Sequence, residues 1–278
     1  MESWSRPRLM GVLNVTPDSF SDGGEFLEIS SAIEQVSLMI GQGAQIIDVG
    51  GESTRPGAKR IDVAEEQNRV LPVIAEIKKE FDTMVSIDTM NAATARKAVQ
   101  AGADIVNDIS GGLADPQMFA AIADLDCLYV LGHWRGHSDQ MDLLANYSDV
   151  AREVVAELAE QVSMAVASGI SRDRIIVDPG LGFAKDIHHN WDLVNRLNEL
   201  EALNLPILVG ASRKRFLAHA LDPKDPTSVS MPRRDLATAV LTALLLQRKL
   251  WGVRVHDVQN TKDAIAIVAA LKKDQEAN

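Results

Sequence analysis

Short apolar runs alternate with longer amphipathic stretches along most of this chain. Apolar runs of strand length occur at 9–15, 45–49, 84–88, 105–109, 127–131, 175–178, 207–209 and 252–255. Between them apolar residues recur at helical spacing, for example over 32–42, 63–81, 92–101, 149–168 and 234–249. Strands that alternate with helices predict β-α-β units and therefore a parallel sheet.

The number of these units separates two α/β architectures. Eight candidate strands favour a closed (β/α)8 TIM barrel, and a doubly wound open sheet is the alternative. The length of 278 residues fits a single barrel, a fold that commonly takes about 250 residues. No linker, low-complexity tract or shift in composition divides the chain, so we expect one domain over 1–278.

Composition and charge narrow the class of protein. Hydrophobic residues make up 46% of the chain and aromatic residues only 4%, a mixture that suits parallel strands covered by helices. The formal net charge of -11 argues against nucleic acid as a partner, because neutralising phosphates requires a basic face. No apolar run reaches the roughly 20 residues of a membrane span, and the polar N-terminus does not resemble a signal peptide, so we expect a cytoplasmic protein.

The single cysteine and the histidines give no sign of a metal centre. Cys127 lies in an apolar run, and one cysteine excludes a disulfide framework and a cysteine-based zinc site, so we expect a buried thiol. His133, His137, His188 and His189 show no convincing ligand spacing, and His188 and His189 are expected on a solvated face.

Polar clusters follow nearly every predicted strand at its C-terminal side. They lie at 14–24, 50–57, 86–89, 107–112, 178–185, 210–214 and 254–257. In a barrel the C-terminal ends of all strands meet on one rim, where such enzymes place their active sites. The sequence therefore predicts an active site at this rim.

Three short polar residues end otherwise apolar strands: Asp88, Asn107 and Asp178. Each taken alone is equally well explained as a cap or turn residue before the next helix. Together they suit a flat heterocycle with several N–H groups, because a carboxylate accepts two hydrogen bonds and an amide both donates and accepts.

The cations available at the rim are Arg55, Lys214, Arg254 and His256. A surface cation is usually solvated, but the i, i+2 spacing of Arg254 and His256 directs both side chains to one side of the last strand. If that side faces the barrel mouth, the two form an anion clamp. The segment 210–214 lacks the glycine spacing of a P-loop. The loops at 14–24 and 50–57 are interpreted either as connectors or as lids that close over a reactive intermediate.

These clusters resemble the dihydropteroate synthase family over about 9–265. The segments that carry the resemblance are NVTPDSFSDGG at 14–24, GGESTRPG at 50–57, DPGLGFAK at 178–185, SRK at 212–214 and RVHD at 254–257. One segment departs: the family commonly has Met at the positions of Gly132 and Trp134 and Pro at that of Ser138. The Met equivalent to Gly132 usually packs on the pterin.

The resemblance implies an enzyme that joins a 6-hydroxymethyl-7,8-dihydropterin diphosphate to 4-aminobenzoate, with Mg2+ as cofactor and a homodimer as the assembly. It implies that the pterin is held by Asp88, Asn107, Asp178 and Lys214, and the diphosphate by Asn14 (through Mg2+), Thr54, Arg254 and His256. It implies that 4-aminobenzoate is bordered by Arg55, Pro56, Phe183 and Ser212, and that Asp22 organises the closed loops. Asp22, Arg55 and Lys214 are the implied catalytic residues.

Two rival functions share part of this pattern. A pterin-binding methyltransferase barrel acting on methyltetrahydrofolate would share the floor of the site formed by Asp88, Asn107 and Asp178. It would not need the SRK segment together with the anion clamp of Arg254 and His256. A non-catalytic paralogue that binds a pterin or a protein would tolerate the change at Gly132, but it would not need Asn14, Asp22 or Lys214. Diphosphate release that depends on both substrates would separate the three.

Overall fold

The computed structural model describes residues 7–15, 25–52, 61–137, 140 and 143–277. Its strands form one 8-stranded parallel sheet in the order β6-β5-β4-β3-β2-β1-β8-β7. A parallel bridge between Val177 and Ile207 connects β6 to β7, so the sheet curves round into a barrel. The strands are β1 (Arg8–Asn14), β2 (Ile46–Gly50), β3 (Met84–Asp88), β4 (Ile105–Asp108), β5 (Leu128–Gly132), β6 (Ile175–Asp178), β7 (Leu208–Val209) and β8 (Gly252–Val255).

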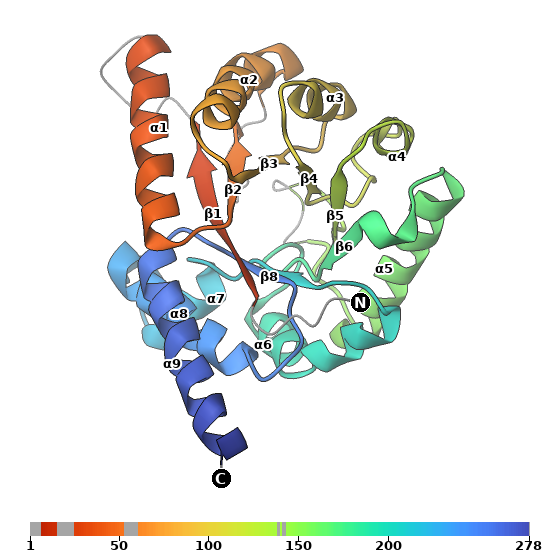
Figure 1. The fold of residues 1–278 in the computed structure, drawn as a ribbon. Coiled ribbons are helices and arrows are strands. Elements are labelled where there is room, and N and C mark those ends of the chain that lie inside the picture. Colours follow the sequence, from red (N-terminus) through yellow and green to blue (C-terminus); the bar gives the residue numbers. More distant parts are fainter. Residues whose placement is uncertain (1–6, 16–24, 53–60, 138–139, 141–142, 278) are drawn as a thin grey trace.

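Helices surround this sheet on the outside (Figure 1). They are α1 (Glu25–Gln42), α2 (Val63–Glu80), α3 (Ala92–Gln100), α4 (Met118–Ala123), α5 (Val150–Ala167), α6 (Ile187–Asn195), α7 (Arg215–Leu221), α8 (Met231–Leu245) and α9 (Val258–Ala277). Within the described residues, 3-10 helices lie at η2 (Arg172–Arg174), η3 (Leu197–Leu203) and η4 (Pro226–Ser228). The alternation confirms the predicted (β/α)8 barrel and excludes the open sheet. None of the described helices is long and apolar enough to cross a membrane.

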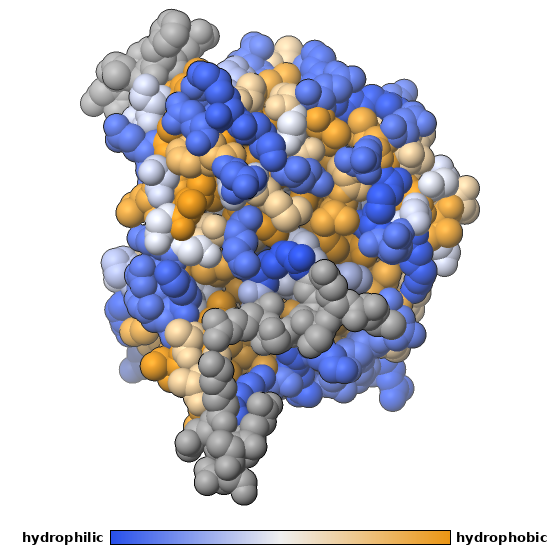
Figure 2. All heavy atoms as spheres, viewed as in Figure 1, coloured by the Kyte–Doolittle hydropathy of each residue, from blue (hydrophilic) through white to orange (hydrophobic). Residues whose placement is uncertain are grey.

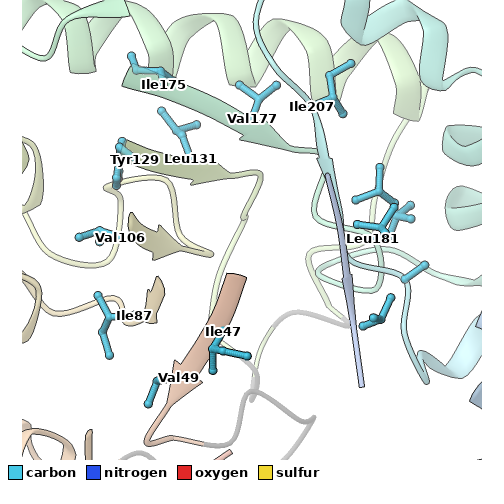
Figure 3. Packing of buried hydrophobic residues seen from close by; sticks show 14 of the residues in the cluster. Ile47, Val49, Ile87, Val106, Tyr129, Leu131, Ile175, Val177, Leu181 and Ile207 are labelled. Atoms are coloured by element: carbon cyan, nitrogen blue, oxygen red, sulfur yellow. The ribbon is translucent and has the colours of Figure 1, made fainter. Parts of the chain in front are cut away.

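The strands bury two separate apolar clusters, one on each face of the sheet. The outer cluster packs between the sheet and the helices, and Figure 3 shows part of it, from Val49 of β2 to Ile207 beside β7. The inner cluster fills the barrel and consists of Met10, Ile46, Ile105, Val130, Ile176, Leu208 and Trp251. Because side chains alternate between the faces of a strand, these inner residues identify which positions point into the barrel.

The predicted boundaries hold within a few residues at most elements. α2 begins at Val63 as expected, because Asp62 caps it by accepting a hydrogen bond from Glu65 N. α1 begins at Glu25, well before the expected 32, and α8 covers 231–245 where 234–249 was expected. α8 begins early because Pro232 suits a first helical turn, where its missing N–H costs nothing.

Candidate active site

The inward positions of the barrel change from apolar to polar toward the C-terminal ends of the strands. Two residues after Ile46 comes Asp48, two after Ile105 comes Asn107, and two after Ile176 comes Asp178. The parallel register sets Asp88 opposite Asn107 on the neighbouring strand. The apolar inner cluster therefore fills the barrel below a polar layer formed by Asp48, Asp88, Asn107 and Asp178. This layer lies at the rim where barrel enzymes place their sites.

Arg254 of β8 lies across this polar layer and connects it to two other strands. Its Nη1 donates to Asp48 Oδ2 at 2.9 Å and to Asp88 Oδ2 at 2.8 Å. Asp48 also accepts a hydrogen bond from Asn107 Nδ2 at 3.1 Å, so the amide nitrogen of Asn107 donates to a carboxylate within the protein. The buried Asp48 carboxylate therefore orients both Arg254 and Asn107, which turns the amide oxygen of Asn107 away from it.

Burial changes the protonation of this layer. Removal from water, with the negative charge of Asp48 nearby, raises the pKa of Asp88 to about 7, and the attraction of Arg254 only partly opposes this. The two carboxylates keep the pKa of Arg254 above its usual range, so the guanidinium stays charged. Burial lowers the pKa of Lys214 to about 7, although Asp178 works in the opposite direction.

Asp178 and Lys214 are connected by the turn that follows β6. Gly180 N donates to Asp178 Oδ1 at 2.7 Å, which leaves the second carboxylate oxygen available. Lys214, at the start of α7, donates through Nζ to the carbonyl of Leu181. The same ammonium lies 4.3 Å from the centre of the Phe183 ring, a cation–π contact. The structure thus brings together Asp178, Phe183 and Lys214, which the sequence places in two separate segments.

Ser212 and His256 also meet at the rim. Ser212 Oγ accepts from His256 N at 3.1 Å and lies 2.9 Å from His256 Nδ1. Arg213, between Ser212 and Lys214, has a left-handed φ of 61° and is held by a two-pronged ion pair to Asp235 of α8 at 2.7 and 2.8 Å. This ion pair fixes the backbone that presents both Ser212 and Lys214.

The prediction for Arg254 and His256 had two parts: that both lie on one side of the last strand, and that together they bind an anion. Only the first part is met. Both follow the inward side of β8, but Arg254 is engaged by carboxylates below the rim, whereas His256 contacts Ser212 at its edge. Joint binding of an anion by the two remains a prediction.

Asn14 ends β1 at an inward position, half-buried, and a Cβ placed on Gly50 would lie 3.9 Å from its side-chain oxygen. Among the described residues, no three His, Cys, Asp or Glu side chains form a group that could hold a metal. Mg2+ does not need such a group, because it takes one or two protein oxygens and completes its shell with water and phosphate oxygens. An amide oxygen at the rim is compatible with this mode of binding.

Several predicted residues lie outside the described residues: Asp22, Thr54, Arg55, Pro56 and Ser138. Sequence reasoning missed Asp48, although a carboxylate two positions after an inward Ile was a signal for it. Gly132 packs closely on the chain after β4, where an added Cβ would lie 2.7 Å from the carbonyl oxygen of Ile109. Cys127 is buried as expected, and burial raises the pKa of its thiol to about 11.

Comparison with known proteins defines the class first. Residues 10–256 match the family described as pterin binding enzyme. A dihydropteroate synthase of Mycobacterium leprae is 49% identical over 264 residues, covering 95% of this chain and 93% of the relative. The chain therefore belongs to the dihydropteroate synthase family of pterin-binding enzymes.

Solved structures agree with this assignment. The dihydropteroate synthase of Xanthomonas albilineans with 4-aminobenzoic acid has a TM-score of 0.87 and 38% identity, covering 96% of this chain and 93% of that one. The same enzyme in complex with 7,8-dihydropteroate has a TM-score of 0.85 and 35% identity, covering 97% and 95%.

Proposed function

We propose that this enzyme joins 6-hydroxymethyl-7,8-dihydropterin diphosphate to 4-aminobenzoate, giving 7,8-dihydropteroate and diphosphate. The observation that carries the proposal is the polar layer above the inner cluster, where Asp88, Asn107 and Asp178 occupy inward positions beside Lys214 and Arg254. The relatives that share the fold at 35–49% identity are named for this activity.

The layer suits the hydrogen-bonding edge of a pterin. The free oxygen of Asp178 accepts N–H groups of the aminopyrimidinone, and the amide oxygen of Asn107 accepts another, because Asp48 holds its nitrogen. Lys214 donates to a ring acceptor. Arg254, held by Asp48 and Asp88, adds a positive charge beside this edge.

The reaction replaces a C–O bond with a C–N bond. The bond between the pterin methylene and diphosphate breaks, and both electrons leave with diphosphate. The reduced pterin ring delocalises the positive charge on the methylene, the arylamine nitrogen attacks it, and the amine then loses a proton. When bound at Asn14, Mg2+ supplies positive charge for the leaving group. His256 and Arg254 add to this stabilisation, and Phe183 and Ser212 line the approach of 4-aminobenzoate.

Diphosphate release is the direct test. The purified enzyme with Mg2+ should release diphosphate only when both substrates are present, and 7,8-dihydropteroate should form in equal amount. Release without 4-aminobenzoate would indicate a hydrolase. No release, with pterin binding retained, would favour the non-catalytic paralogue, and methyl transfer from methyltetrahydrofolate would favour the methyltransferase.

The assembly is proposed to be a homodimer formed through α8 and α9. Leu236, Val240 and Leu244 recur every four residues on α8, Ile267 and Leu271 do the same on α9, and each is more than half exposed. Figure 2 shows hydrophobic residues in orange and tan at the lower left, where Figure 1 has these helices. Exposed apolar faces of this kind mark protein interfaces. Analytical ultracentrifugation should find a dimer for the native chain and a monomer for Val240→Asp.

The location is proposed to be cytoplasmic. Fractionation of cells that produce the protein tests it, and recovery with the membrane or secreted fraction would contradict it.

A further inference from the structure

Lys185 is a buried lysine that the proposed chemistry leaves unexplained. It follows the turn after β6, and its side chain is almost fully removed from water. Its Nζ donates to the carbonyl oxygens of Gly180 at 3.0 Å and Phe183 at 3.1 Å, and it lies 2.9 Å from His133 Nδ1. Burial lowers the pKa of Lys185 well below its ordinary value, but Nζ is surrounded by two carbonyl oxygens and the Nδ1 of His133, and only the protonated amine has three N–H donors to match them. All three of Lys185 are therefore used within the protein, two of them on the turn itself.

The loop after β5 holds this ammonium from the other side. His133 Nε2 lies 2.9 Å from the carboxylate of Glu157 on α5, which Arg135 also binds. Burial and the nearby charge of Lys185 lower the pKa of His133 to about 4, so its ring is neutral at neutral pH. A neutral ring donates from one nitrogen and accepts at the other. Here Nε2 donates to Glu157 and Nδ1 accepts from Lys185.

The turn that Lys185 anchors has an unusual backbone. Gly180 and Gly182 have φ values of 65° and 78°, and Ala184, which is not glycine, has 46°. A side chain on Gly180 would lie 2.2 Å from the carbonyl oxygen of His133, so the β5 loop packs directly on the turn. Left-handed backbone at non-glycine positions costs free energy and persists where surrounding contacts enforce it. The two bonds from Lys185 to Gly180 and Phe183 are such contacts.

The same turn carries groups that face the site. The carbonyl of Leu181 accepts from Lys214, the Phe183 ring lies under the Lys214 ammonium, and Gly180 N holds Asp178. The carbonyl of Phe183 points back to Lys185 while its ring points to Lys214. Any shift of the Lys185 anchor is therefore transmitted to Phe183 and Lys214.

We propose that Lys185, held by His133, is a positioning residue of the active site: it fixes the turn at 180–184 and thereby sets the places of Phe183 and Lys214. Lys185 contacts neither substrate in this proposal. The inference rests on the proposed function, which assigns 4-aminobenzoate to Phe183 and the pterin to Lys214.

The test is Lys185→Met, which keeps the length of the side chain but removes its donors. Well below the melting temperature, we expect kcat/KM for 4-aminobenzoate to fall about ten- to a hundredfold, since a displacement of about 1 Å in a positioning group produces losses of this size. Hydrogen exchange at the amides of 180–184 should become faster. An unchanged kcat/KM in a folded variant would overturn the proposal.

Lys78→Met is the matched control. Lys78 of α2 donates to Thr83 O and Asp104 at the opposite end of the barrel, at 3.2 and 3.1 Å. The Lys78→Met variant should have a lower melting temperature and an unchanged kcat/KM. Equal losses from both variants would mean that Lys185 acts only through stability, which would contradict a positioning role.

A second pair of variants covers the case in which Lys185→Met does not fold. His133→Asn keeps an acceptor near the position of Nδ1, whereas His133→Phe keeps a ring without one. We expect His133→Phe to reduce kcat/KM for 4-aminobenzoate and His133→Asn to restore most of it. Equal effects of the two would overturn the proposal.

A double-mutant cycle of Lys185→Met with Phe183→Ala tests whether Lys185 acts through Phe183. If Lys185 acts through Phe183, the losses of the single variants will not add, and purely additive losses would contradict that route. A wild-type enzyme that releases no diphosphate would refute the proposed function instead. The hydrogen exchange of 180–184 would then still decide whether Lys185 holds the turn.

Discussion

Asp48→Asn removes one negative charge from the floor of the site without changing its shape. The buried carboxylate accepts from Arg254 Nη1 at 2.9 Å and from Asn107 Nδ2 at 3.1 Å. Both groups donate to Oδ2, and Asn107 Nδ2 also lies 3.4 Å from Oδ1. An amide oxygen in the place of Oδ2 keeps both bonds without the charge, and the new NH2 group in the place of Oδ1 meets Asn107 Nδ2 donor-to-donor. Arg254 retains its bond to Asp88 at 2.8 Å, which limits the damage.

The expected loss follows from these two contacts. A bond to a charged partner is worth about 1.5–3 kcal/mol and a neutral one about 1, so weakening the contact to Arg254 costs about 1 kcal/mol. Leaving one buried donor unmatched costs about 1–3 kcal/mol more. The free energy of unfolding should therefore fall by about 2–4 kcal/mol in urea denaturation.

Ser86→Ala is the control for this measurement. Ser86 is buried in register with Asp48 on the next strand, and within the described part of the chain its hydroxyl has no hydrogen-bond partner. Its removal should leave the unfolding free energy nearly unchanged. A loss below about 0.5 kcal/mol for Asp48→Asn would refute the view that this carboxylate organises the floor, since surface substitutions have effects of that size.

Three further predictions concern the rim. His256→Ala should weaken binding of the pterin diphosphate far more than binding of the unphosphorylated pterin, as measured by calorimetry, and equal losses would show that His256 does not bind phosphate. Folded Asp88 keeps its proton up to about pH 7 whereas the unfolded carboxyl releases it near 3.8, so this group lowers the unfolding free energy as pH rises between those values. Asp88→Asn should flatten that part of the stability profile, and an unaltered slope in urea titrations would contradict the raised pKa. Gly132→Ala should lower the unfolding free energy by about 1–3 kcal/mol, because its Cβ meets the backbone of Ile109 and forces a shift; an unchanged melting temperature would show that the segment yields freely.

Much of the barrel could be predicted from local patterns. Each strand is an apolar run followed by a polar cluster, and Asp88, Asn107 and Asp178 stand where those runs end, so counting units and assuming a common rim was enough to gather them. Helix starts were less certain: α1 begins at 25 where 32 was expected, and α8 begins at 231 where 234 was expected.

The contacts between strands could not be predicted. Nothing in the sequence near Arg254 shows that its partners are Asp48 and Asp88, more than 160 residues away. Lys185 and His133 belong to different β-α units, and only the parallel register of β5 and β6 brings them together. A lysine in a polar segment has the same sequence signature whether it is solvated or buried.

The central claim is that the inward carboxylate of Asp178 binds the pterin, and calorimetry with a dihydropterin tests it most directly. Asp178→Asn should keep the fold and weaken binding about ten- to more than a hundredfold, the loss of a charged hydrogen bond worth about 1.5–3 kcal/mol. Asp186→Asn is the control, because Asp186 caps α6 a few residues further along and Asn caps equally well. Affinity that is unchanged in Asp178→Asn, or reduced equally in both variants, would contradict the claim.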